Sequence, residues 1–471
     1  MNNNSIWGRM FKTSMLYTFG IVLAKFTTFL LLPLYTNRIP TEDYGTYDLV
    51  IAYSAIIVPL VGVNCWQGML RFVIEEKDIN NRHRIISQGW IMLILSGIVL
   101  SLGYGIICFY LSFSHKILIY CCFITQLFQY FYLYSSRGFN RNKVYAWSGV
   151  VSSLTVAAVT IICVFVFNMT LAALYISLAV SLIVQVVFME YYLRLMKDIS
   201  LGWVDWTKIR EIYKYCAPEA VSNVFNWLLD SVNRVIIVAV LGLSANGIYA
   251  ISHKFIGILT VFVSAFVLSF QESIYAVGRD ELKKVVDEVL CKFTKYIGIF
   301  VSLLLLFTSI VYPIFVSGEY REGYMLIPLF YAKFLVSGIT WLLSSTVSAT
   351  KKTQLTLYEK MLIGTINFML IMVLIRPLGL SSSPISLLTA ECCGILVFKY
   401  LLSAKAGLSI SIPIRYIVGD FILLAITSTL FLYNSIYFNA IGILLLLSST
   451  AFINRKNIQL IYIKIKRKIT I

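Results

Sequence analysis

The sequence predicts an all-α, polytopic membrane protein with about 14 transmembrane helices. Of its 471 residues, 59% are hydrophobic and 13% are charged, whereas soluble domains have about 45–50% apolar and about 25% charged residues. The apolar runs are about 20 residues long, which suits helices that cross about 30 Å of hydrocarbon, and the alternation typical of barrel strands is absent. Composition and run length together favour a bundle of membrane helices.

The apolar segments can be placed along the chain, and the first is expected to stay as an uncleaved helix because the weakly basic residues 1–12 lead into a run without a cleavage site. The predicted spans are 13–36, 46–70, 87–111, 117–136, 145–167, 170–193, 213–241, 248–275, 294–316, 324–348, 355–375, 383–402, 414–433 and 436–453.

The distribution of basic residues predicts the orientation. With the N-terminus inside, the inner connections and both tails hold roughly 31 of the 39 Lys and Arg residues, against about four outside. Both termini are therefore expected on the cytoplasmic side of the membrane. The net charge of +17 is then a topology signal with affinity for anionic lipid, and nucleic acid is not expected as a partner.

The sequence offers no metal or catalytic centre. Its nine Cys are scattered without CxxC spacing, and three His are too few to complete a metal cluster. No Walker A motif is present, so we expect no ATP hydrolysis by this chain.

The most informative stretch is the seventh span, read as one helix over 213–241. Polar residues recur there every three or four positions and form one stripe. They are Glu219, Ser222, Asn223, Asn226, Asp230 and Asn233. Arg234 follows Asp230 by four residues, and Lys254 lies in the next span. Charges at the bilayer centre cost about 2.5–3.5 kcal/mol and usually face a bundle interior or a water-filled cavity, so the stripe predicts a polar lumen. The alternative is that Asp230 and Arg234 only neutralise each other inside the bundle.

Further ionisable residues occupy other spans. Lys25 lies deep in the first span, and Arg71 ends the second at the inner face. Lys333 heads a stripe of hydroxyl residues in the tenth span, where the hydroxyls alone are typical of helix–helix contacts. Glu391 is an isolated acid in the twelfth span, either protonated and packed or used for ion coupling. Residues 279–295 predict an amphipathic helix on the inner surface.

The chain also shows a two-fold organisation. Tyr44-Gly45-Thr46-Tyr47 has an echo in Asn246-Gly247-Ile248-Tyr249, each after the first span of its half, which indicates a parallel repeat. The predicted parts are an N-terminal six-helix lobe (1–195), a cytoplasmic linker (196–212), a C-terminal six-helix lobe (213–405), two extra helices (406–454) and a basic cytoplasmic tail (455–471).

Three stretches resemble a known family. Residues 31–50 (LLPLYTNRIPTEDYGTYDLV), 68–72 (GMLRF) and 215–255 are similar to the bacterial flippases for lipid-linked oligosaccharides, the repeat units of O-antigen, capsule and exopolysaccharide. These flippases belong to the multidrug, oligosaccharidyl-lipid and polysaccharide exporter superfamily. The chain departs from the family in having Asn233, where an Asp commonly precedes the Arg.

The resemblance implies two lobes around a central cavity and alternating access that turns over an undecaprenyl-pyrophosphate-linked glycan. A pyrophosphate needs fixed cations in a wet cavity. The candidates for binding pyrophosphate and glycan are Arg234, Lys25, Lys254, Lys333, Arg71, Asn223 and Asn226. Asp230 and Glu391 are candidates for H⁺ or Na⁺ coupling, with the membrane potential as the other driving force. The resemblance implies no cofactor. We expect the protein to function as a monomer, with a polysaccharide polymerase and other export machinery as partners.

Other functions fit this sequence less well. A polysaccharide polymerase or ligase would act on the same lipid-linked sugars, but the predicted outer connections are short, whereas catalytic groups concentrate on loops. A cation-coupled drug exporter of the same superfamily would need an acidic lumen, and this one has more cations than acids. Amino-acid or ion transport is the remaining alternative.

Overall fold

The computed structural model describes residue 22 and residues 25–275, 279–350, 354–405, 407–433 and 435–453. All of its regular structure in these ranges is helical. Residues 25–30 are helical and lead into α2. The other helices are α2 (Leu32–Arg38), α3 (Thr41–Val61), α4 (Cys65–Glu75), α5 (Ile79–Tyr110), α6 (Lys116–Gly138), α7 (Asn142–Phe165), α8 (Leu171–Leu193), α9 (Leu195–Asp198), η1 (Leu201–Trp203), α10 (Trp206–Asp230), α11 (Val232–Leu241), α12 (Leu243–Lys254), α13 (Ile256–Tyr275), α14 (Arg279–Phe315), η2 (Gly318–Leu326), α15 (Ile327–Ala349), α16 (Gln354–Leu378), η3 (Gly379–Ser381), α17 (Ser382–Ala404), α18 (Ile414–Tyr433) and α19 (Ile436–Ile453).

The described part of the chain contains 9 helices long and apolar enough to cross a membrane, or up to 11 if each of two bent pairs is one span. The protein is thus an all-α, multi-pass membrane protein, as the sequence predicts, whereas the count of 14 spans is not established. Part of the first predicted span and the basic tail 455–471 lie outside the described residues. Large apolar side chains face outward along the helices, as on Ile98, Leu102 and Phe109 of α5, which suits contact with lipid.

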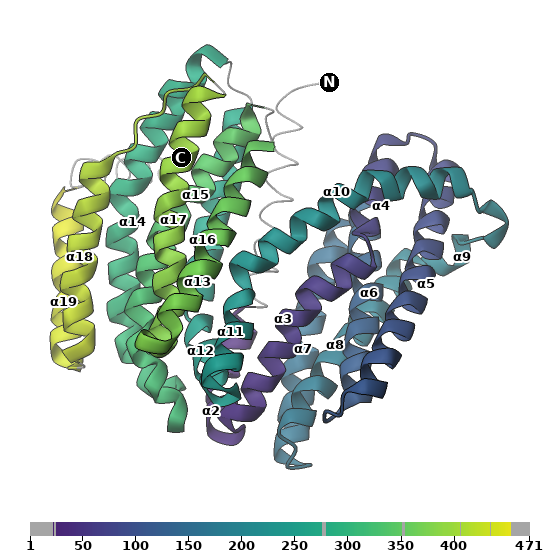
Figure 1. The fold of residues 1–471 in the computed structure, drawn as a ribbon, viewed down its shortest axis with the longest axis horizontal. Coiled ribbons are helices and arrows are strands. Elements are labelled where there is room, and N and C mark those ends of the chain that lie inside the picture. Colours follow the sequence, from purple (N-terminus) through teal and green to yellow (C-terminus); the bar gives the residue numbers. More distant parts are fainter. Residues whose placement is uncertain are drawn as a thin grey trace, which may run out of the picture.

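The helices gather into two bundles that converge at one end and diverge toward the other (Figure 1). One hydrophobic core is built from residues of α3 to α10 and includes Met69, Phe131 and Ile212. The other draws on α2 and on elements from α11 to α18. Helix α10 contacts both α3 and α4 on one side and α16 on the other, and it crosses between the bundles in Figure 1. The boundaries predicted for the lobes stay a prediction.

The bundles meet where α3 crosses α12, and two glycines allow this close approach. A Cβ added to Gly45 would lie 1.8 Å from the backbone oxygen of Leu243, and one added to Gly247 would lie 2.1 Å from that of Thr41. Real side chains do not come so close, so only glycine fits at either position. The two residues are the glycines of the echoed tetrapeptides, which therefore pack directly on each other. We call this contact the glycine seam, and the end of the molecule where it lies the Thr41 end.

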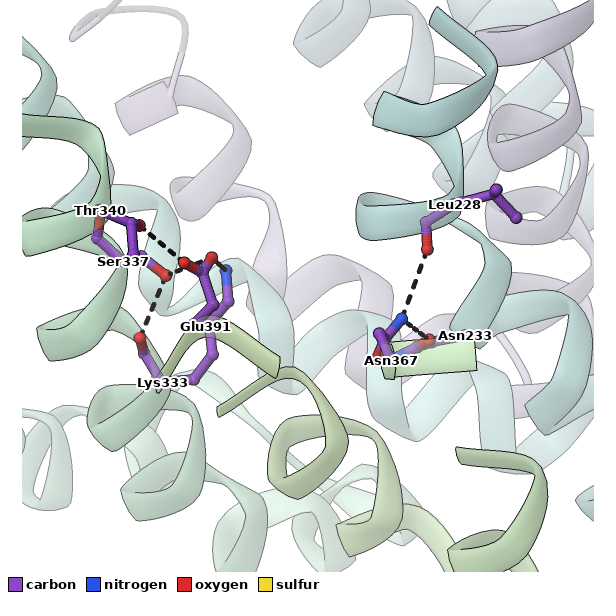
Figure 2. Close-up of polar contacts among 7 residues, drawn as sticks. All are labelled: Leu228, Asn233, Lys333, Ser337, Thr340, Asn367 and Glu391. Atoms are coloured by element: carbon purple, nitrogen blue, oxygen red, sulfur yellow. Dashed lines mark hydrogen bonds and ion pairs between the residues drawn. The ribbon is translucent and has the colours of Figure 1, made fainter. Parts of the chain in front are cut away.

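The predicted continuous helix over 213–241 is wrong. Helix α10 ends at Asp230, α11 begins at Val232, and the two flanking segments are bent by 47°. The break is stabilised by an amide network shown in Figure 2, in which Asn367 Nδ2 donates to the oxygens of Asn233 (2.8 Å) and Leu228 (3.3 Å). A buried carbonyl released by a helix break needs such a partner.

A second break lies between α3 and α4. Val63 and Asn64 both have positive φ, at 47° and 49°, a region that a β-branched residue such as Val rarely occupies. The chain turns here four residues after Pro59, whose ring ends regular helical bonding. The backbone N–H of Asn64 then donates to the backbone oxygen of Pro59 at 3.0 Å.

Residues 279–295 are helical and amphipathic, as predicted, but they do not form a separate helix on the membrane surface. Helix α14 runs unbroken from Arg279 to Phe315, and the apolar face of its first half packs into a protein core. Leu282, Val286 and Leu290 are each at most 4% exposed. No helix breaker separates this segment from the apolar run that follows, and burial against neighbouring helices offers its apolar face an alternative to the membrane surface.

Candidate functional site

An ion pair links the two bundles next to the glycine seam. Arg234 of α11 contacts Asp48 of α3, with Nε 2.7 Å from Oδ2, and both side chains are only 16% and 17% exposed. Asn246 of α12 donates from Nδ2 to the Gly45 oxygen at 2.8 Å and to Asp48 Oδ2 at 3.4 Å. Three helices from both halves therefore converge on one carboxylate. Asp48 is one partner of Arg234. The side chain of Asp230 lies outside the described residues, so its pairing with Arg234 stays a prediction.

Lys254 lies beside this pair, against aromatic rings. Its Nζ is 4.5 Å from the ring centroid of Tyr35 and 4.9 Å from that of Tyr44, a geometry in which ring faces attract a cation. Asp48 and Lys25 are the charges that act on it most. Lys25 itself is exposed and reaches along Gly257 of α13. Three of the predicted cations, Arg234, Lys254 and Lys25, are thus brought to one region between the bundles.

Hydroxyl and carboxylate contacts close the Thr41 end. Thr41 Oγ1 is 2.7 Å from Ser244 Oγ and donates to Glu319 Oε2, also at 2.7 Å. The Tyr320 hydroxyl donates to the Ile39 oxygen at 3.0 Å. These bonds join the starts of α3 and α12 to η2, so the bundles are held together at this end in the described state.

Arg71 of α4 lies away from the glycine seam, against α10. Its Nε is 2.9 Å from Glu75 Oε1, and the side chain is 52% exposed. The guanidinium carbon lies 4.5 Å from the ring centroid of Tyr215 on α10. An exposed ion pair is worth little, about 0–1 kcal/mol, so this cation can exchange its partner readily.

Asn223 and Asn226 line a cavity of about 300 Å³ between α3, α4, α6 and α10. Asn226 Nδ2 donates weakly to Asn223 Oδ1 at 3.4 Å. Both amides are partly exposed. In position along α10 they lie between Tyr215, which touches Arg71, and the start of α11, which carries Arg234.

Lys333 and Glu391 lie in a separate cluster within the C-terminal bundle (Figure 2). Glu391 Oε1 is 3.9 Å from Lys333 Nζ and accepts a bond from Ser337 Oγ at 3.1 Å, while Oε2 accepts one from Thr340 Oγ1 at 2.6 Å. The hydroxyls of the tenth span thus serve this acid. The described ion pair of Lys333 is the one with Glu391.

Three residues of the candidate site were not predicted from the sequence. Asp48 stands at the opening of the second predicted span and was not singled out, although an acid directly after the echoed tetrapeptide could have signalled a partner. Asn64 follows Gly62-Val63, a turn-like interruption in an apolar run. Glu359 of α16 is 5% exposed and was hidden by its position beside Lys360 at the start of a predicted span.

Comparison with known proteins identifies the family. The profile described as "Polysaccharide biosynthesis protein" matches residues 11–270, more than half of the chain. The chain belongs to this family. The match confirms the resemblance stated from the sequence and places this membrane protein among the transporters of the multidrug, oligosaccharidyl-lipid and polysaccharide exporter superfamily. No curated protein sequence matches the chain.

This polysaccharide biosynthesis protein shares its fold with solved structures of membrane transporters. The lipid II flippase MurJ in an inward closed conformation has a TM-score of 0.70 at 14% identity and covers 95% of this chain and 100% of its own. An inward-facing multidrug resistance MATE transporter of the MOP superfamily has a TM-score of 0.62 at 13% identity, covering 84% and 96%. The Vibrio cholerae MATE transporter VcmN in the bent form has a TM-score of 0.53 at 12% identity, covering 88% and 98%.

Proposed function

We propose that this protein translocates an undecaprenyl-pyrophosphate-linked oligosaccharide from the cytoplasmic to the outer leaflet of the bacterial inner membrane, for surface polysaccharide biosynthesis. Family membership and the fold shared with the lipid II flippase support a lipid-linked substrate. The proposal adds the direction, the lipid carrier and the mechanism, which is alternating access between the two bundles.

The observation that carries this proposal is the row of cations between the bundles. Arg71 lies toward one end of α10, Arg234 and Lys254 lie beyond the other, and Asn223 and Asn226 lie between them. A pyrophosphate carries about two negative charges, which cannot be buried without cations. Arginine suits phosphate oxygens because its planar fork donates two parallel bonds.

Arg234 is already paired with Asp48, and this pairing suggests how binding drives the transition. A pyrophosphate that reaches Arg234 competes with the Asp48 carboxylate for the same donors. Displacing Asp48 removes a link between α3 and α11 beside the glycine seam. In this proposal, substrate binding therefore weakens the contact that holds the Thr41 end closed, and opening at that end releases the glycan.

The positive-inside distribution supports an assignment of the Thr41 end to the outer face and the Arg71 end to the cytoplasm. The bundles converge at the Thr41 end (Figure 1). The described state then accepts substrate from the cytoplasmic side, where lipid-linked repeat units are expected to be assembled.

Energy for transport has two proposed sources. An inside-negative potential favours anion export by about 2.3 kcal/mol per charge per 100 mV. Alternatively, Glu391 couples transport to H⁺ or Na⁺, because protonation or a bound cation would replace Lys333 and the two hydroxyls that now hold its carboxylate. Glu359, a second buried acid whose charge acts on Glu391, favours this coupling role. Asp230, the other predicted coupling residue, lies outside the described side chains.

The experiment follows lipid-linked glycan on each face of the inner membrane in cells that lack this protein and in cells that carry variants. Loss of the protein is expected to accumulate glycan on the inner face. Arg234→Ala, at wild-type protein level, is expected to restore less than about 1% of export, because about 3 kcal/mol of phosphate binding and more is lost. Arg376→Ala removes an exposed arginine from the end of α16 and should export normally.

Two outcomes would contradict the proposal. Normal glycan turnover in cells without the protein would exclude the flippase role and favour drug or ion transport. Full export by Arg234→Ala would remove this cation from the mechanism while leaving the flippase role intact.

A further inference from the structure

The break between α3 and α4 opens onto the cavity of about 300 Å³ that also contains Asn223 and Asn226. The cavity is at the small end of the range for ligand sites, about 300–1,000 Å³. It lies in the N-terminal bundle where α4 begins, and α10 covers it from the side of the second bundle. Nothing in the family match or in the related structures assigns a ligand to it.

Asn64 gives this cavity an unused hydrogen-bond donor. The residue lines the cavity wall and is 1% exposed, and its Nδ2 has no hydrogen-bond partner among the described residues. Buried amide donors are almost always paired. A ligand that supplies the acceptor for Asn64 Nδ2 would explain this exception. The left-handed backbone at Asn64 places its side chain at the break between α3 and α4.

The rest of the lining combines amides with aromatic rings. Gln67, Asn223 and Asn226 each provide both a donor and an acceptor. Trp66 stacks on Tyr130 with ring centroids 4.7 Å apart. The indole N–H of Trp227 is already bonded to the Ala52 oxygen, so this side chain offers the cavity its apolar ring. Such a wall suits a ligand with hydroxyls around its edge and C–H groups on its face.

We propose that this cavity is a subsite for an uncharged sugar ring, a hexose or N-acetylhexosamine, with Asn64 as a donor to one of its hydroxyl or acetamido oxygens. The inference rests on the proposed function, because the sugar belongs to the glycan of the transported lipid. Along α10 and α11, the cavity lies between Tyr215, which contacts Arg71, and Arg234, so a sugar in it would be near a pyrophosphate bound to either arginine. Asn223 is eight residues from Tyr215, about 12 Å along the axis of α10, and Asn226 lies four residues before the end of α10, beyond which α11 carries Arg234.

The test uses the full chain in lipid nanodiscs and the intrinsic tryptophan fluorescence, since Trp66 and Trp227 line the cavity. Wild type, Asn64→Leu and Asn439→Leu are titrated with the methyl glycosides of glucose and N-acetylglucosamine, with glucuronic acid, and separately with inorganic pyrophosphate. Asn439 is a matched control: its side chain is 1% exposed, also has an unpartnered amide atom, and lies on α19.

We expect at least one neutral glycoside to change the fluorescence of wild type and of Asn439→Leu. Asn64→Leu should weaken that affinity about tenfold, as the loss of one well-placed hydrogen bond does. Affinity for pyrophosphate should stay unchanged, because the cations are intact. If Asn64→Leu does not fold, Gln67→Leu, at a partly exposed position of the same wall, takes its place with the same expectation.

Equal glycoside affinity in wild type and in the folded pocket variants would overturn the sugar subsite, and so would preferential binding of glucuronic acid or binding of pyrophosphate alone. These results leave the flippase role standing if cells that lack the protein still accumulate glycan on the inner face. Normal glycan turnover in such cells removes the flippase role, and the sugar subsite that rests on it fails at the same time.

Discussion

At the scale of single residues, the polar side chains in these membrane helices are held by specific partners. Asp48 takes contacts from Arg234 and Asn246, and Glu391 takes contacts from Lys333, Ser337 and Thr340. Buried charges persist in a low-dielectric interior only when paired and hydrogen-bonded. Each acid is therefore coupled to the residues around it, and removing one member leaves another charge without compensation.

The Lys333–Glu391 pair allows a direct test of this coupling. Glu391→Gln is expected to destabilise the protein by about 2–3 kcal/mol, because Lys333 loses its counter-charge in a partly buried position. The double variant Lys333→Met/Glu391→Gln should recover most of that loss, since no unpaired charge remains. Thermal unfolding of the purified variants in one detergent measures both effects, and a double variant less stable than either single one would show that the pair is not the stabilising feature.

The Arg234 pairing shows where prediction from the sequence stops. Side chains four residues apart are neighbours only in an unbroken helix, so the prediction paired Arg234 with Asp230. The chain bends at this point, and the described residues show a partner of Arg234 that comes from a distant helix, Asp48 of α3. The break itself depends on buried bonds from Asn367 and Ser383, which no local pattern in 213–241 reveals.

At the scale of elements, the glycine seam sets how closely the two halves approach. The echo of Tyr44-Gly45 in Asn246-Gly247 was visible in the sequence, and its position at equivalent turns predicted a repeat. That the two glycines lie on each other was not predictable, because the crossing of α3 and α12 is a tertiary contact. The prediction for α14 failed for a similar reason, since its apolar face packs on protein rather than lipid.

Adding one methyl group to the seam should force the helices apart. In Gly247→Ala the new Cβ would lie 2.1 Å from the Thr41 oxygen, so α3 or α12 must shift. Export should fall at least about tenfold, as expected when closure loses more than about 1.4 kcal/mol. Gly103→Ala is the control, because a Cβ on this α5 residue meets nothing within 4 Å. Normal export by Gly247→Ala would mean that closure at the Thr41 end does not need this contact.

At the scale of the whole molecule, composition and run length were sufficient to predict an all-α membrane protein, and the family followed from short stretches of resemblance. Fold class and family depend on average hydrophobicity and on local sequence, and both can be read from a single sequence. The arrangement of the site depends on which helices touch. Accordingly, the sequence indicated the cations between the bundles, but it did not indicate which acid pairs with Arg234 or Lys333, or the pocket at Asn64.

The most direct measurement of the central claim is translocation by the purified protein in proteoliposomes loaded with undecaprenyl-pyrophosphate-linked oligosaccharide. Exposure of the glycan on the far leaflet is read with a membrane-impermeant lectin. The variant Thr41→Cys/Ser244→Cys, in a background with the nine native Cys replaced, provides a lock, because the native hydroxyl oxygens are 2.7 Å apart, so the two side chains already meet.

The account predicts that wild type turns over the lipid-linked glycan, that the oxidised double-cysteine variant does not, and that reduction restores its transport. Retained transport by the oxidised, cross-linked protein would contradict opening at the Thr41 end. No turnover by folded wild-type protein, with or without a membrane potential and a proton or sodium gradient, would contradict the flippase itself.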